Sequence, residues 1–169
     1  MALIPIAKVF GVTAAGILSG LQISFSHITM PVLLQTAPDN LLAKQWLAFY
    51  KIGASVAPPY AITCAICFGF LAYKSRNLKG LLPDAGPFDP TTPFALYTAA
   101  AVSIPAIVPW TVTQMVPTND RLMLKAAQND AFGLEEAQAL VAKWVALHMV
   151  RVGLVVFGTV CGACGAVLS

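Results

Sequence analysis

The stretch WVALHMVRVGLVVFGTVCGACGAVL, residues 144–168, decides the fold of this 169-residue chain. About 20 mainly apolar residues are enough for a helix to cross the hydrocarbon core of a bilayer. An arginine at the bilayer centre costs about 2.5–3.5 kcal/mol on insertion scales, so it usually has a partner, a wet cavity or a place near the interface. Because 17 residues of the stretch follow Arg151, we expect Arg151 about one turn inside the membrane boundary and His148 closer to it.

The composition predicts that the whole chain is a membrane protein. It is 58% hydrophobic and 10% charged, whereas soluble domains carry about 25% charged residues. We predict an all-α transmembrane four-helix bundle, a single domain over residues 1–169 with spans at about 4–28, 54–73, 92–116 and 140–168. The first apolar segment is interpreted as a retained span rather than a signal peptide, because Lys8 interrupts it and three more apolar segments follow. The net charge of +3 forms no basic patch, so nucleic acid is not an expected partner.

A short amphipathic helix is predicted over residues 42–53, before the second span. Its apolar residues recur at helical spacing, and Trp46 and Tyr50 suit the water–lipid boundary. Pro58-Pro59 should break or kink the start of the second span, since proline removes a backbone donor. Either aromatic residue is then a simple membrane anchor or part of a pocket at that boundary.

Positive charges indicate the orientation in the membrane. Lys74, Arg76 and Lys79 follow the second span closely, which favours a cytoplasmic second loop and cytoplasmic termini. We expect an integral, multi-pass protein of an endomembrane, in contact with the lipid bilayer. This topology brings several polar and aromatic residues to one end of the bundle: His27, Trp46, Tyr50, Asn119, Asp120, His148 and Arg151.

Small and polar residues indicate close helix packing. Gly16-xxx-Gly20 and Gly158-xxx-Gly162 permit close approach of helices, within the chain or between subunits of a homo-oligomer. Ser19, Gln22 and Ser26 form a polar stripe on the first span. The stripe is interpreted as a source of interhelical hydrogen bonds or, alternatively, of contacts to a substrate.

The cysteines and histidines do not predict a metal site. The pairs Cys64/Cys67 and Cys161/Cys164 lie within apolar spans, where small cysteines serve helix packing. A quinone-linked thiol oxidoreductase is the alternative, but the chain has no loop cysteines to relay electrons. His27 and His148 have no carboxylate at a metal-ligand spacing, although the sequence leaves a bound metal open.

Two motifs connect the chain to a known family. Pro117-x-Asn119-x-x-Leu122 lies in a predicted polar turn after the third span, and Trp144-x-x-x-His148-x-x-Arg151 opens the fourth span. In this order they resemble the anthrone oxygenase-like family of small four-span membrane proteins, whose fungal members serve aromatic polyketide pathways. The layout is similar over essentially the whole chain. The resemblance implies an oxygenase that converts an anthrone to an anthraquinone with molecular oxygen, without a dedicated metal or flavin.

The activity implied by the resemblance requires a base, donors for an oxyanion and an apolar slot for a flat aromatic substrate. His148 is the expected base, because imidazole titrates near neutral pH, and His27 is the alternative base. Arg151 and Asn119 would stabilise the enolate oxygen. The remaining expected substrate contacts are the aromatic walls of the slot and one polar side chain: Trp46, Tyr50, Trp144 and Gln22.

The competing hypothesis is a non-enzymatic integral membrane protein. In that case His148, Arg151 and Asn119 form a structural polar clamp that ties the fourth span to the third loop. Substitutions would then lower stability or assembly without selectively removing an activity.

Overall fold

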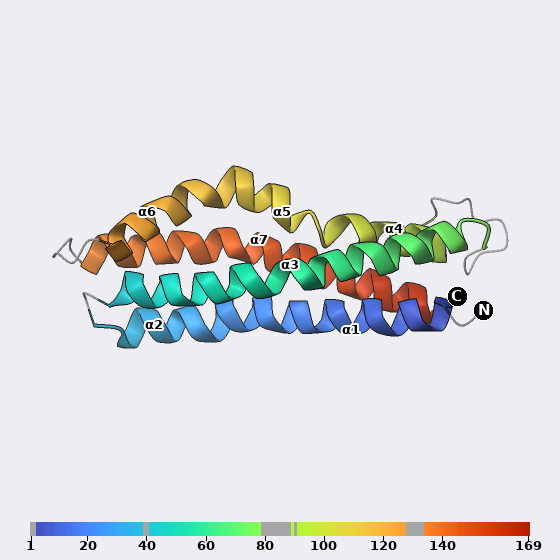
Figure 1. The fold of residues 1–169 in the computed structure, drawn as a ribbon, viewed down its shortest axis with the longest axis horizontal. Coiled ribbons are helices and arrows are strands. Elements are labelled where there is room, and N and C mark those ends of the chain that lie inside the picture. The colour runs from blue at the N-terminus through green and yellow to red at the C-terminus, as the bar shows by residue number, and fades with distance from the viewer. Residues whose placement is uncertain (1–2, 39–40, 79–88, 90, 128–133) are drawn as a thin grey trace. The chain divides into compact units, whose positions relative to one another are not determined.

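The computed structural model describes residues 3–38, 41–78, 89, 91–127 and 134–169, and these residues form only helices and their connections (Figure 1). The all-α prediction is therefore confirmed. In chain order the helices are α1 (Leu3–Ser24), the π-helical turn η1 (Phe25–Thr29), α2 (Met30–Thr36), α3 (Leu42–Ser75), α4 (Pro93–Ser103), α5 (Ile107–Trp110), the π-helical turn η2 (Thr111–Met115), α6 (Val116–Ala127) and α7 (Leu134–Val167).

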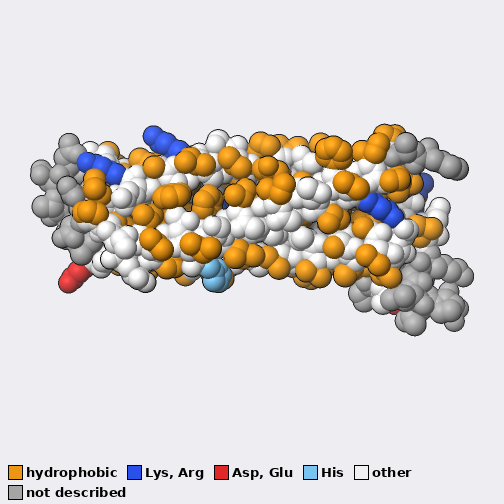
Figure 2. Space-filling model, turned by 90° about the horizontal axis from the view of Figure 1, so that it is seen from below, with side chains coloured by type: hydrophobic (Ala, Val, Ile, Leu, Met, Phe, Trp, Pro, Cys, Tyr) orange, Lys and Arg blue, Asp and Glu red, His pale blue; other side chains and the backbone are white. Residues whose placement is uncertain are grey.

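Four helical stretches are long and apolar enough to cross a membrane: Leu3–Thr36, Leu42–Ser75, Pro93–Ala127 and Glu135–Val167. Apolar side chains are spread over the face shown in Figure 2, and charged side chains are few there. Each stretch is longer than the span predicted from hydrophobicity, because a helix continues into polar residues that still favour helical backbone. Lys79, one of the cations used to predict the orientation, lies outside the described residues.

The segment predicted as a separate short helix is the first part of α3. Residues 42–53 run without interruption into the second candidate span, and Pro58 and Pro59 lie inside the helix without ending it. Both prolines are exposed. The missing N–H groups of the two prolines leave the carbonyls one turn earlier, those of Ala54 and Ser55, without their usual helical donors. Membrane helices tolerate proline where side chains or small adjustments satisfy freed backbone groups.

The predicted polar turn at residues 117–121 is wrong, because this segment is helical. It forms the first part of α6. Pro117 is its second residue and directly follows the π-helical turn η2, so α6 continues an existing helix. The helix buries Thr118, Asn119 and Leu122 on one side, while Asp120 and Arg121 are exposed. Asn119 therefore lies on a buried helix face rather than in a loop.

The chain divides into two compact units, and α1, α3 and α7 contribute residues to both. Unit 1 contains Met1–Ser19, Pro58–Ile107 and Gly153–Ser169. Unit 2 contains Gly20–Ala57 and Val108–Val152. The four residues of the predicted catalytic set and the four predicted substrate contacts all belong to unit 2.

Unit 1 is packed by aromatic rings against glycines. A Cβ atom added to Gly162 would lie 2.4 Å from Cζ of Phe68, and one added to Gly165 would lie 3.0 Å from Cε1 of Tyr97. The rings of Phe68 and Tyr97 are stacked, with centroids 6.2 Å apart. The Gly158-xxx-Gly162 motif thus serves close packing inside this unit, as its spacing predicts.

Both π-helical turns lie in unit 2, and each ends two residues before a proline. Met30 N–H donates to the Phe25 carbonyl across η1, and Val116 N–H donates to the Thr111 carbonyl across η2. Pro31 and Pro117 follow. A proline cannot donate to the carbonyl one turn earlier, so the helix changes its hydrogen-bond pattern just before it. Such single π turns are frequent at functional sites.

Candidate active site

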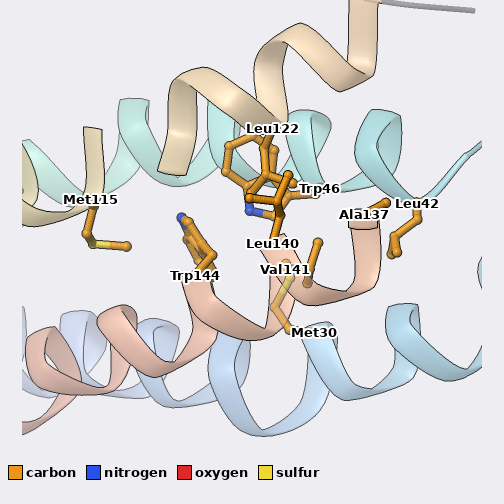
Figure 3. Packing of buried hydrophobic residues seen from close by; sticks show 9 residues of the cluster. All are labelled: Met30, Leu42, Trp46, Met115, Leu122, Ala137, Leu140, Val141 and Trp144. Carbon is orange, nitrogen blue, oxygen red and sulfur yellow. The ribbon is translucent and has the colours of Figure 1, made fainter. Parts of the chain in front are cut away.

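Two tryptophans form the centre of the apolar core of unit 2. Trp46 of α3 is fully buried and Trp144 of α7 is nearly so. Their rings meet edge to face, with centroids 6.0 Å apart. Figure 3 shows them among apolar side chains from α2, α3, η2, α6 and α7. The other buried members of this core are Met30, Leu42, Met115, Leu122, Ala137, Leu140 and Val141.

Each indole already has an aromatic neighbour on one face. Trp46 stacks on Tyr50 at a centroid distance of 5.1 Å and an interplanar angle of 17°. Trp144 stacks on the imidazole of His148 at 4.6 Å and 20°. The four rings therefore form a continuous group from Tyr50 to His148. One face of each indole is thus occupied by a protein ring and cannot stack on a ligand.

His148 is buried and held from two directions. Its Nδ1 atom lies 2.7 Å from Oγ of Ser26 on η1, and both side chains are buried. Trp144 lies against the plane of the same ring. Because the hydrogen bond uses Nδ1, Nε2 is the ring nitrogen left for a substrate.

Arg151 is partly buried one turn beyond His148 on α7. Its Nη1 atom lies 4.0 Å from Sδ of Met115, which is a weak contact. Its Nε atom is buried and makes no hydrogen bond to any described residue. The ion pair found in the described part of the chain joins Lys125 to Glu136 instead. Arg151 is therefore a cation without a carboxylate partner among the described residues, in a helix apolar enough to span a membrane.

Further buried polar atoms in unit 2 have no hydrogen-bond partner among residues that the structure describes. They include the indole Nε1 atoms of Trp46 and Trp144 and both amide atoms of Asn119 and of Gln22. A buried donor or acceptor without a partner costs about 1–3 kcal/mol, so folded proteins rarely keep several of them. Native exceptions of this kind call for a specific explanation, such as a catalytic role or a bound molecule.

The structure brings together most, but not all, of the residues predicted for the site. Ring contacts join Trp46, Tyr50, Trp144 and His148. Asn119 is one turn from Met115, the residue that touches Arg151. Gln22 is buried one turn before Ser26. His27, by contrast, is exposed on η1, so it is not gathered with the others.

Sequence reasoning missed two contacts of the predicted site residues. Ser26 was assigned only to the polar stripe of the first span, yet it binds His148. The stripe does make interhelical bonds, because Ser19 also pairs with Thr159 at 2.8 Å. Met115 carried no polar signal at all. The only signal in the sequence was a proline two residues after each π turn, at Pro31 and Pro117. A proline there can change which side chains of the preceding turn face the neighbouring helix.

The cysteines belong to unit 1, whereas the predicted site residues belong to unit 2. All four are free, and Cys64 Sγ lies 3.9 Å from the Gly11 carbonyl oxygen. Within the described ranges, no three residues of the types His, Cys, Asp or Glu are grouped so that they could hold a metal ion.

Comparison with known proteins identifies the family. The family model described as anthrone oxygenase matches residues 46–161. Anthrone oxygenase AgnL2 of Paecilomyces divaricatus is 32% identical over 165 residues, which cover 94% of this chain and 94% of the relative. Anthrone oxygenase tpcL of Aspergillus fumigatus is 31% identical, with 93% and 91% covered. Monooxygenase hypC of Dothistroma septosporum is 31% identical, with 92% and 80% covered.

No solved structure matches the chain. The family match includes the Asn119 motif and the complete Trp144–Arg151 motif, which carried the resemblance in the sequence. Relatives of 31% and 32% identity extend the similarity over more than nine-tenths of the chain. The chain therefore belongs to the anthrone oxygenase family.

Proposed function

We propose that this protein oxidises an anthrone-type aromatic polyketide to an anthraquinone with molecular oxygen, starting from proton removal by a protein base. One observation carries the proposal for the site: the buried His148 stacks on Trp144, in a unit whose buried polar atoms include several without a hydrogen-bond partner among the described residues. A flat aromatic ketone with oxygen atoms on its edge would supply acceptors for the indole N–H groups and for Arg151.

The chemistry needs only a base and oxygen. The central methylene of an anthrone is acidic, because its anion is delocalised onto the carbonyl oxygen as a phenolate. The base takes one methylene proton, and the electron-rich anion forms a carbon–oxygen bond with O₂. Protonation gives a hydroperoxide, and loss of water from it gives the second carbonyl. One anthrone and one O₂ thus yield one anthraquinone and one water.

The residues of unit 2 are assigned to these steps by their chemistry. His148 accepts the methylene proton through Nε2. Arg151 and Asn119 stabilise the negative charge that develops on the substrate oxygen, since preorganised donors are worth most in a water-poor site. The N–H groups of Trp46 and Trp144 bind further substrate oxygens. Gln22 and Tyr50 are the remaining residues assigned to contact the substrate.

We propose O₂ as the co-substrate and no resident cofactor. Exhaustive chelation of the purified protein should leave its turnover unchanged. Loss of turnover that returns on adding one metal would overturn this part of the proposal. Metal analysis of the same sample provides the independent measurement.

The direct test is oxygen consumption by the detergent-purified protein against a panel of anthrones. His148→Ala and Arg151→Ala should each lower turnover by at least about 100-fold, the lower range for a general base or an oxyanion donor. His27→Ala tests the alternative base, and Lys143→Ala is a control for removing a cation from an exposed position of α7. Near-normal rates for His148→Ala with loss in His27→Ala would exchange the two roles.

The structural clamp makes the opposite prediction for the same variants. If His148 and Arg151 only stabilise the fold, both alanine variants lower the thermal midpoint, and wild-type protein consumes no oxygen with any anthrone. Unfolding and turnover measured on the same preparations separate the two functions.

The membrane arrangement that accompanies this function is also a proposal. We propose four spans in an endomembrane with cytoplasmic termini, because Lys74 in the last turn of α3 and Arg76 just after that helix favour a cytoplasmic second loop. We also propose an interfacial position for the first turns of α3. Labelling of single introduced cysteines in a cysteine-free background from each side of sealed membranes tests the orientation.

Gly16 and Gly20 are exposed, with no atom within 4 Å of an added Cβ. Their free faces favour packing between subunits, which cross-linking would detect.

A further inference from the structure

Ser26 and His148 form a buried hydrogen-bonded pair, and Ser26 has no role in the proposed reaction steps. The Oγ and Nδ1 atoms are 2.7 Å apart, and the side chains are 4% and 2% exposed. Water therefore competes little for either atom. The pair joins η1 to α7 over a sequence separation of 122 residues.

The direction of this hydrogen bond decides whether the ring can act as a base. A neutral imidazole carries its proton on one nitrogen only. If the Ser26 hydroxyl donates to Nδ1, the proton is on Nε2, and Nε2 has no lone pair to accept another. If Nδ1–H donates to Oγ, Nε2 has its lone pair free.

We propose that Ser26 is a positioning residue whose oxygen accepts the Nδ1–H of His148 and thereby holds Nε2 ready to take the substrate proton. The inference rests on the proposed role of His148 as the base. It assigns a function to a residue that the motif Trp144-x-x-x-His148-x-x-Arg151 does not contain.

One physical argument favours this direction. The bond keeps its direction when Nε2 takes up a proton, because Nδ1–H is a donor in the neutral and in the charged ring. No group has to reorient during proton transfer, and such preorganisation lowers the barrier.

Trp144 completes the restraint on the ring. Its indole lies against the imidazole at 4.6 Å and 20°, which limits tilting of the ring, while Ser26 fixes its edge. The face of an indole also attracts a cation. The same contact therefore stabilises the imidazolium that proton transfer creates.

Nitrogen NMR of the histidines tests the tautomer without using activity. The chain has two histidines, so ¹⁵N-histidine labelling of His27→Asn leaves His148 as the single labelled ring. We expect a protonated Nδ1 and an unprotonated Nε2 for the neutral ring, and an increase of the Nε2–H tautomer in Ser26→Ala. If the neutral His148 ring carries its proton on Nε2 in the protein that keeps Ser26, the inference is overturned.

Kinetics test the consequence. Ser26→Ala should lower kcat for anthrone oxidation by about 10- to 100-fold, the range expected for a misoriented catalytic group, with KM changed less than about twofold. Ser26→Thr keeps a hydroxyl and should recover most of kcat. Ser24→Ala is the matched control two residues earlier, where the side chain makes no capping hydrogen bond to η1, and it should turn over normally.

The outcomes separate this inference from the proposed function. Normal kcat in Ser26→Ala, despite a changed tautomer, contradicts a base at His148. Normal kcat with an unchanged tautomer contradicts the positioning role. If wild-type protein has the Nδ1–H tautomer but oxidises no anthrone, the inferred direction of the hydrogen bond is correct and the proposed function is wrong. If Ser26→Ala does not fold, the wild-type tautomer and the Ser26→Thr kinetics still decide.

Discussion

The two units use the same long helices in opposite ways. Unit 1 brings helices into close contact through glycines, and its buried serine Ser19 is paired with Thr159. Unit 2 has two tryptophans at the centre of its core and, among the described residues, several buried polar atoms without a hydrogen-bond partner. Of the nine buried side-chain atoms found without a hydrogen bond in the described residues, eight belong to unit 2 and one, Oγ of Ser103, belongs to unit 1.

We expect this difference to separate stability from the proposed function within one chain. A unit that buries unpartnered polar groups folds less favourably than one with its groups paired or apolar. Strained or unsatisfied groups persist where the surrounding structure over-determines them, and they cluster at sites of function. Unit 1 is thus expected to respond to substitution through stability, and unit 2 through activity.

The largest stability effect is expected at Gly162 of unit 1. In Gly162→Ala the new Cβ would lie 2.4 Å from Phe68, so the ring or helix must move, at a cost of about 1–3 kcal/mol. Gly69→Ala, in the same unit with no atom within 4 Å of the added Cβ, is the control. It should be neutral or up to about 1 kcal/mol stabilising. Thermal unfolding in detergent measures both, and equal midpoints would refute the close contact.

Asn119→Leu tests the opposite behaviour of unit 2. Replacing two unpartnered amide atoms by an apolar side chain of similar size should leave the free energy of unfolding unchanged or raise it by about 1–3 kcal/mol. Anthrone turnover should fall at least about 100-fold, as for the loss of an oxyanion donor. The matched control is Ser103→Ala, which removes the unpartnered hydroxyl of unit 1 and should keep full turnover. A less stable but active Asn119→Leu would favour the structural clamp.

The Ser19–Thr159 bond should contribute to stability alone. Ser19→Ala is expected to lower the free energy of unfolding by about 0.5–1.5 kcal/mol, the usual net worth of one hydrogen bond, with unchanged turnover. Combining it with Thr159→Val gives a double-mutant cycle that isolates the pair. Strictly additive single effects would mean that the bond contributes nothing.

The smallest effect is expected for the ion pair of unit 2, in which the lysine side chain is 12% exposed. Lys125 and Glu136 are bonded, and the glutamate side chain is 57% exposed. Glu136→Gln should change the free energy of unfolding by about 0.2–1 kcal/mol at low salt and by less at high salt. Chemical unfolding at two salt concentrations checks this. A large, salt-independent loss would show that the pair is a main support of unit 2.

Hydrophobicity was sufficient to predict four long apolar helices, because a chain in lipid must satisfy its backbone within helices. It could not predict where those helices end. Pro58 and Pro59 were expected to interrupt α3, and residues 117–121 were expected to form a turn, because soluble-protein rules for proline and polar residues were applied. The membrane helix continues through both, since little else satisfies its backbone groups.

The sequence predicted residue types for a candidate site, but it could not predict their contacts. Spacing on one helix predicted that Trp144 and His148 share a face, and their rings are stacked. The partner of His148 lies 122 residues away, and spacing carries no information about which residue of a facing helix it meets. Likewise, spacing could not show that His27 is exposed while its neighbour Ser26 is buried, because the π turn alters the helix surface at that point.

The π turn η1 affects how the sequences of homologues should be aligned and interpreted. A π turn holds about one residue more than the α-helical turn it replaces, and a single residue corresponds to a rotation of about 100°. A homologue that lacks one residue just before the equivalent of Pro31, but aligns on both sides, should have a regular helix there. Its serine would be turned away from the histidine even though both letters remain in the alignment. A one-residue gap at this position is thus expected to mark family members that have lost the Ser26–His148 bond.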